Sequence, residues 1–180
     1  DGLALLREHN CDLVVGLGGG SPMNAAKVIA VAAMNDAPIR EFAGYHRIAR
    51  AGRPLVLIPT TAGTGSEGTK VAVITDTERD VKMMMLDVHL LANVALVDFE
   101  LSLTMPASLT AHVGVDTLTH GIEAYVSKKA NALTHPLAEQ CIRLAADLKL
   151  GRHVTFTGFL RGHDVDRIFN MADLYVMPSV

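Results

Sequence analysis

The chain lacks the features that mark membrane, nucleic-acid-binding and disulfide-bonded proteins. Its apolar runs are all shorter than the roughly 20 residues of a membrane-spanning helix, so no membrane contact is expected. It has no basic cluster and a formal net charge of −3, which argues against nucleic acid as a partner. Its two cysteines, Cys11 and Cys141, have no metal-type spacing and are typical of free thiols, so a cytoplasmic location is expected.

What the chain does have is enough apolar sequence for a sizeable core. Of its 180 residues, 49% are apolar and 19% are charged, which favours one folded domain, or a domain and a half, over disorder. The chain begins at Asp1, and residues 2–9 already have a helical pattern. We therefore expect a piece cut from a longer protein.

Short apolar runs alternate with helical patterns over the first hundred residues. Residues 12–18, 55–59 and 93–98 are typical of buried parallel strands. Residues 71–75 and 82–86 flank a polar turn and predict a hairpin. Between the first two strands, Ser21 as N-cap and Pro22 as the first helical residue predict a helix to about Met34.

Residues 106–149 have a helical pattern in about three pieces, with a break expected at His135-Pro136. Beyond them, strand patterns at 153–159 and 174–179 flank a helical pattern at 164–172. The predicted fold class is α/β, with a Rossmann-like, mostly parallel sheet, a β-hairpin, a helical segment and a C-terminal βαβ unit. The expected domains are 1–103, 104–150 and 151–180.

Three segments carry residues suited to chemistry. Gly18–Ser21 joins a strand to a helix, where glycines and free N–H groups suit a phosphate, although a tight turn alone explains it equally well. Residues 60–64 form a Thr/Gly loop after a strand and suit either a nucleotide or helix capping. Asp116 and His120, four residues apart on a helix, could share one metal ion or be solvated neighbours.

Over residues 1–150 the chain resembles the iron-containing (group III) alcohol dehydrogenases. The resemblance depends on three segments in this order: Gly18–Ser21, Pro59–Glu67 and Gly114–Tyr125. The resemblance implies hydride transfer between a primary alcohol and a nicotinamide, with NAD or NADP as cofactor. It also implies iron(II) or zinc as Lewis acid and a small alcohol or aldehyde as substrate. The resemblance is also compatible with a homo-oligomer.

The resemblance also implies roles for individual residues. In the first loop, Gly19, Gly20 and Ser21 would hold the pyrophosphate, and Asn24 stands where the family usually has an aspartate. Candidates that would face the cofactor from the later segments are Thr60, Thr61, Thr64, Thr69 and Lys82, although Lys82 also suits a solvated hairpin.

Asp116 and His120 match the first two metal ligands of the family. The resemblance implies that the other two are histidines much further along, well after the point near Leu150 where the resemblance stops, and neither His112 nor His135 suits that role. The first βαβ unit, with its ribose-binding acidic residue, is also missing. We therefore expect the chain to be inactive by itself.

The last thirty residues resemble a different family. The runs 156–160 and 168–179 look like the C-terminal domain of glycogen-synthase-like retaining glycosyltransferases, and the chain ends before the sugar-nucleotide loop. This predicts a fragment or chimera derived from an alcohol dehydrogenase, with the two tail strands paired to its sheet. The alternative is a non-catalytic, engineered or selected α/β fusion module, and a glycosyltransferase is the least favoured reading.

Overall fold

The computed structural model describes residues 1–147. The chain divides into two compact units, Asp1–Thr110 and Ala111–Val180, and each is described by itself. Within the described part, every helix is too short or too polar to cross a membrane. The expected tail strands at 153–159 and 174–179, and their pairing with the sheet, lie outside the described residues.

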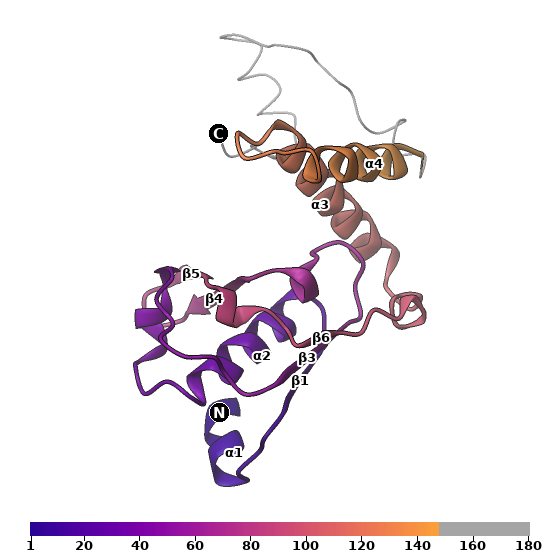
Figure 1. Ribbon diagram of the computed structural model, residues 1–180. Helices are drawn as coiled ribbons and strands as arrows, with labels where there is room; N and C mark the ends of the chain where they lie inside the picture. Colours follow the sequence, from indigo (N-terminus) through magenta and orange to yellow (C-terminus); the bar gives the residue numbers. More distant parts are fainter. Residues whose placement is uncertain (148–180) are drawn as a thin grey trace. The chain divides into compact units, whose positions relative to one another are not determined.

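The first unit contains a parallel sheet of three strands in the order β1-β3-β6 (Figure 1). The strands are β1 (Val14–Gly18), β3 (Leu55–Pro59) and β6 (Val94–Ala95). The predicted parallel strands are confirmed, but β6 is shorter than expected. β6 stops at Ala95 because its neighbour β3 ends at Pro59, which has no N–H to continue the ladder. The Asp98 carboxylate then accepts a hydrogen bond from the Glu100 N–H at 3.0 Å and starts the 3₁₀ helix η4 (Phe99–Ser102).

A second sheet, in the order β2-β5-β4, contains the predicted hairpin. Its strands are β2 (Gly44–Tyr45), β4 (Val71–Asp76) and β5 (Val81–Leu86). β4 and β5 are antiparallel, with Val71 opposite Leu86 and Asp76 opposite Val81. β2 pairs parallel to β5 and was not expected, because two residues are too few to give a periodic pattern.

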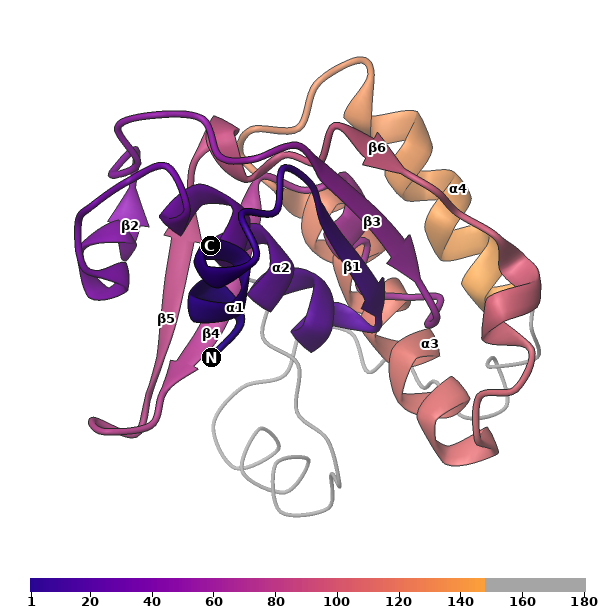
Figure 2. The same cartoon turned by 90° about the horizontal axis from the view of Figure 1, so that it is seen from below.

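The helix α2 (Gly20–Ala32) lies between the two sheets (Figure 2). Its residues Met23, Ala26 and Ala30 pack on the parallel sheet against Leu55 and Leu57. On its other side it packs against the second sheet through the buried residues Val28, Val31, Ala32, Ala72, Met83 and Met85. The preceding helix α1 (Gly2–Glu8) packs on α2 where Gly2 approaches Ile29. The core of the unit is therefore built around one helix.

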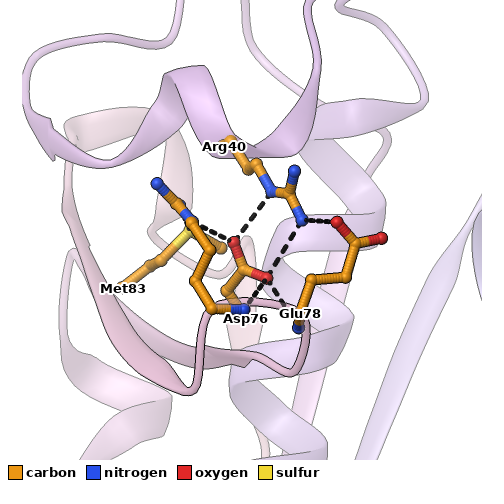
Figure 3. Close-up of polar contacts among 5 residues, drawn as sticks. Arg40, Asp76, Glu78 and Met83 are labelled. Carbon is orange, nitrogen blue, oxygen red and sulfur yellow. Dashed lines mark hydrogen bonds and ion pairs between the residues drawn. The ribbon is translucent and has the colours of Figure 1, made fainter.

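An ion-pair cluster joins the hairpin to the 3₁₀ helix η1 (Ile39–Phe42) (Figure 3). The buried Asp76 carboxylate accepts hydrogen bonds from Arg79 Nε at 2.6 Å and Arg40 Nε at 2.8 Å. Arg40 also pairs with Glu78. Hydrogen bonds from Arg79 and Arg40 lower the pKa of Asp76 to about 2. Two further 3₁₀ helices, η2 (Ser66–Gly68) and η3 (Val88–Leu90), flank the hairpin in sequence.

The second unit contains α3 (Ala107–Val126) from Ala111 onward and α4 (Thr134–Asp147). The helical pattern does break and restart near His135-Pro136, but the restart comes one residue earlier: α4 begins at Thr134, and both residues lie in its first turn, where proline is tolerated. The break falls before Thr134, where the Asn131 side chain accepts hydrogen bonds from the N–H groups of Leu133 and Thr134. The two helices approach closely at Gly121, beside Cys141.

Candidate dinucleotide-binding site

The turn from β1 into α2 leaves backbone donors uncapped at the helix start. Gly18 adopts a φ of +142°, which L side chains rarely adopt, and Gly19 is the extended N-cap. The helix begins at Gly20, so the prediction of Ser21 as N-cap is wrong and Ser21 lies exposed in the first turn. The N-cap residue is a glycine, and within residues 1–147 no side chain accepts a hydrogen bond from the first-turn N–H groups, which leaves them available to an anion.

The Thr/Gly loop lies beside this turn, at the carboxyl edge of the parallel sheet. The Thr60 N–H donates a hydrogen bond to the Gly18 carbonyl at 2.9 Å, because β3 runs parallel to β1. A Cβ atom at Gly19 would lie 3.2 Å from Thr61 Cγ2, and one at Gly20 would lie 3.3 Å from Thr64 Cγ2. Any side chain at either glycine would therefore fill the space between the two loops.

Two buried polar atoms at this edge have no hydrogen-bond partner within the described part of the chain. They are Thr61 Oγ1 and Asn24 Oδ1. The Asn24 side chain is tied to β4, since its Nδ2 donates to the Val73 carbonyl at 3.3 Å. Buried polar atoms without partners are uncommon in native proteins and indicate groups that bind a ligand or water. The glycine cradle and the free helix N–H groups fit a dinucleotide pyrophosphate, and the Thr61 hydroxyl can donate to it, whereas Asn24 Oδ1 can only accept from a ligand hydroxyl or water.

The structure brings most of the predicted cofactor residues to this edge, but not all of them. Gly19, Gly20, Ser21 and Asn24 belong to the first loop and α2, while Thr60, Thr61 and Thr64 follow β3. Thr69 follows η2 and hydrogen-bonds to a residue of α2. Lys82 is exposed on β5 opposite Thr75, and no hydrogen bond or ion pair of Lys82 occurs within residues 1–147.

Lys27 on α2 was missed by the sequence analysis. Its side chain is fully buried, and its Nζ donates to the carbonyls of Thr69 at 2.7 Å and Val71 at 2.8 Å. Burial lowers the pKa of Lys27 to about 8, partly offset by the negative charge of Glu67. The available signal was its position four residues after Met23 and four before Val31, on a side of the helix that carries apolar residues.

The candidate metal ligands lie on α3. Asp116 Oδ2 is 3.6 Å from His120 Nε2, and the two side chains are 45% and 56% exposed. Of the other two histidines considered, His112 is exposed and His135 stacks beside Tyr125. Within residues 1–147, no group of three or more ligand-type side chains comes together. The described residues thus offer two ligands, fewer than the three or four that catalytic metal sites use.

Family models match both parts of the chain. Residues 1–99 match the model described as iron-containing alcohol dehydrogenase, and residues 110–150 match the Fe-containing alcohol dehydrogenase family, C-terminal. The chain belongs to the iron-containing alcohol dehydrogenase family. Neither match reaches residues 151–180, so the glycosyltransferase resemblance and the chimera have no support from these models.

Relatives in this family have names that specify cofactor and substrate. The chain is 44% identical over 144 residues to the NAD-dependent methanol dehydrogenase of Bacillus methanolicus, covering 80% of this chain and 38% of the relative. It is 43% identical over 146 residues to the 1,3-propanediol dehydrogenase of Klebsiella pneumoniae, covering 81% and 38%. The chain therefore spans less than half the length of these curated relatives.

The fold agrees with a solved structure of the same family. A 1,3-propanediol oxidoreductase superimposes with a TM-score of 0.78 at 42% sequence identity, over 81% of this chain and 38% of that one. The predicted α/β class with a parallel sheet is therefore confirmed. The predicted domain boundaries at 103 and 150 stay predictions.

Proposed function

We propose that the loops Gly18–Asn24 and Thr60–Thr69 bind the pyrophosphate of NAD or NADP. In this proposal the chain is the corresponding part of an alcohol dehydrogenase that transfers a hydride between a primary alcohol and the nicotinamide. The observation that carries it is the uncapped start of α2, which faces Thr61 and Thr64 across two glycines. A helix N-terminus with free N–H groups and a positive dipole end attracts phosphate.

The residues at the carboxyl edge of the parallel sheet would make different kinds of contact with the cofactor. The glycines allow the backbone to approach the pyrophosphate, while the first-turn N–H groups donate hydrogen bonds to it. Thr61 Oγ1 and Asn24 Oδ1, both buried and unpaired in the described chain, would bind ligand hydroxyls or ordered water. Asn24 keeps the capacity for hydrogen bonding at the position where the family usually has an aspartate, but it lacks the charge of that aspartate. The bound cofactor would accept the hydride through its nicotinamide.

The metal-dependent part of the reaction involves α3. Asp116 and His120 would supply a carboxylate and an imidazole, ligand types that iron(II) accepts, and zinc remains the alternative. The other ligands would come from outside the described residues. When bound, the metal would polarise the alcohol oxygen as a Lewis acid. The names of the relatives, which specify methanol and propanediol, favour a small alcohol as substrate. A cytoplasmic location stays a prediction.

Calorimetric titration of the 180-residue chain with NAD⁺ tests the proposal. We expect weak binding, because one missing charged hydrogen bond to the ribose costs about 1.5–3 kcal/mol, or roughly ten- to a hundredfold in affinity. Gly20→Val should abolish binding by filling the space beside Thr64. Gly114→Val is the matched control, because a Cβ at Gly114 meets nothing within 4 Å and Gly114 lies on α3, outside both loops. Unchanged binding in Gly20→Val would place the nucleotide elsewhere.

A further inference from the structure

We propose that Lys27 is a positioning residue that joins the two loops of the dinucleotide site. Its ammonium holds the segment after the Thr/Gly loop against α2, the helix whose first turn forms the other side of the site. The inference rests on the proposed function, but it concerns a residue that neither the motifs nor the resemblance assigned. It predicts that Lys27 controls dinucleotide affinity without contacting the dinucleotide.

Each N–H donor of the Lys27 ammonium has an acceptor within hydrogen-bond distance. Lys27 Nζ has three acceptors, the carbonyls of Thr69 and Val71 at 2.7 and 2.8 Å and Thr69 Oγ1 at 3.2 Å. An ammonium has three N–H donors, so each can be paired. The acceptors lie 42 and 44 residues away in sequence. Lys27 therefore links two distant parts of the chain at a single buried point.

A chain of hydrogen bonds leads from this point to the site. Thr69 Oγ1 contacts the Ser66 carbonyl at 3.4 Å, and the Thr69 N–H donates to the same carbonyl at 3.3 Å. The Ser66 N–H in turn donates to Thr64 Oγ1 at 3.4 Å. Thr64 and Ser66 are the side chains that a Cβ at Gly20 would meet. The position of the threonine side of the site thus depends on where Lys27 holds Thr69.

Direct contact between Lys27 and the pyrophosphate is disfavoured by distance. Lys27 follows Gly20 by seven residues, which corresponds to about 10 Å along a helix axis. Its side chain is fully buried and its donors are already paired. The alternative role is purely structural: the ammonium would satisfy buried carbonyls, and its loss would reduce the stability of the fold while leaving the site intact.

The two roles are separated by comparing Lys27→Met with Phe42→Leu. Phe42 is 2% exposed in the core on the second-sheet side of α2, so its truncation destabilises the same unit without altering the hydrogen bonds to Thr69. Both variants should lower the thermal midpoint. At a temperature where circular dichroism shows both to be folded, Lys27→Met should weaken NAD⁺ binding about tenfold or more, and Phe42→Leu should not. Equal NAD⁺ affinity in Lys27→Met and wild type would overturn the positioning role.

A second variant keeps the test decisive if Lys27→Met does not fold. Thr69→Val removes one of the three acceptors and the hydroxyl contact with Ser66, and it should weaken NAD⁺ binding by a smaller factor. If both variants fold, their effects on affinity should be less than additive, because they disturb the same chain of hydrogen bonds. Additive effects, or wild-type affinity in Thr69→Val when Lys27→Met cannot be measured, would contradict the inference.

Amide hydrogen exchange distinguishes failure of this inference from failure of the proposed function. If wild type itself binds no NAD⁺, the proposed function is wrong. Even then, Lys27→Met should speed exchange of the amides in residues 64–69 relative to those of β5, whereas Phe42→Leu should not. Unchanged exchange in residues 64–69 would show that Lys27 does not position the loop.

Discussion

Lys27 and Asp76 are both buried charged residues of the first unit, and their environments differ. The Lys27 ammonium is paired only with neutral oxygens, so burial dominates and lowers its pKa to about 8. The Asp76 carboxylate is held by two guanidinium groups, which lower its pKa to about 2. Both pKa values fall, so each group makes stability rise with pH within its own titration range. At pH 7 the two shifts differ in effect, because the shift favours the ionised form of the acid Asp76 and disfavours the ionised form of the base Lys27.

Asp76 should stabilise the fold only where it is ionised. Its pKa falls from 3.8 to about 2 on folding, so its contribution is fully present above pH 4 and is lost as the pH falls towards 2. We expect Asp76→Asn to unfold at lower urea concentration than wild type at pH 7. That difference should shrink on acidification through this window. A difference in unfolding free energy that stays constant from pH 5 to pH 2 would contradict the ion-pair role.

Lys27 should likewise make stability rise with pH, but in the alkaline range. Its pKa falls from 10.5 in the unfolded chain to about 8 in the fold, so between these values the unfolded state binds more protons and stability rises with pH. If the whole pKa shift of Lys27 contributes, the free energy of unfolding rises by about 3 kcal/mol over this range. It should be measured as the unfolding free energy of wild type minus that of Lys27→Met from pH 7 to pH 10.5. A flat difference would show that the ammonium is not desolvated.

For individual residues, the sequence shows which groups adjoin one another in the chain, but not which distant residues they contact in the fold. Gly19 and Gly20 could be proposed from sequence because a strand, a glycine run and a helix start adjoin one another in the chain. Lys27 could not, because the carbonyls that justify its burial lie more than forty residues away. For the same reason nothing in the sequence could show that Lys82 lies exposed on β5 without a partner within the described chain.

At the scale of elements, apolar runs predict strands well and boundaries less well. β3 has the predicted bounds, because Pro59 ends an uninterrupted apolar run. The start of α2 was misplaced because the backbone of Gly18 and Gly19 redirects the chain before Ser21 can cap it. The end of β6 depends on its neighbour β3, which ends at Pro59 and has no N–H there to continue the ladder, and apolar periodicity within β6 does not reveal this.

The two glycines of α3 should respond in opposite ways to alanine. A Cβ at Gly121 would lie 3.1 Å from Cys141 Sγ and 3.2 Å from Ile142 Cγ1 on α4, so Gly121→Ala should force the helices apart. A cost of about 1–3 kcal/mol is typical of overpacking. Gly114 has open space around it, and Gly114→Ala should stabilise the helix by up to about 1 kcal/mol.

Thermal unfolding of both glycine variants and of wild type checks this prediction. Gly114→Ala is the matched control, because it makes the same chemical change on the same helix. If Gly121→Ala is also stabilising, the close approach of α3 and α4 at Cys141 is wrong.

At the scale of the whole molecule, activity should need more metal ligands than residues 1–147 bring together. We expect no alcohol oxidation above background, followed by NADH absorbance, when the chain is given NAD⁺, a primary alcohol and iron(II) or zinc. The physical reason is that Asp116 and His120 are the ligands the described residues bring together, and catalytic metal sites use at least three. Metal-dependent turnover that disappears in Asp116→Ala would show that the site is completed in another way, such as by a second copy of the chain.

The position of α2 between two sheets also limits how the sequence can change over time. A substitution at an ordinary surface helix must suit one set of neighbours, but residues of α2 contact Leu57 on one side and Met85 on the other. A side chain that shifts the helix away from one sheet moves it towards the other, so a single compensating change cannot restore both contacts. In a saturation library selected for folding, α2 should tolerate fewer replacements than α4, which has a more exposed surface.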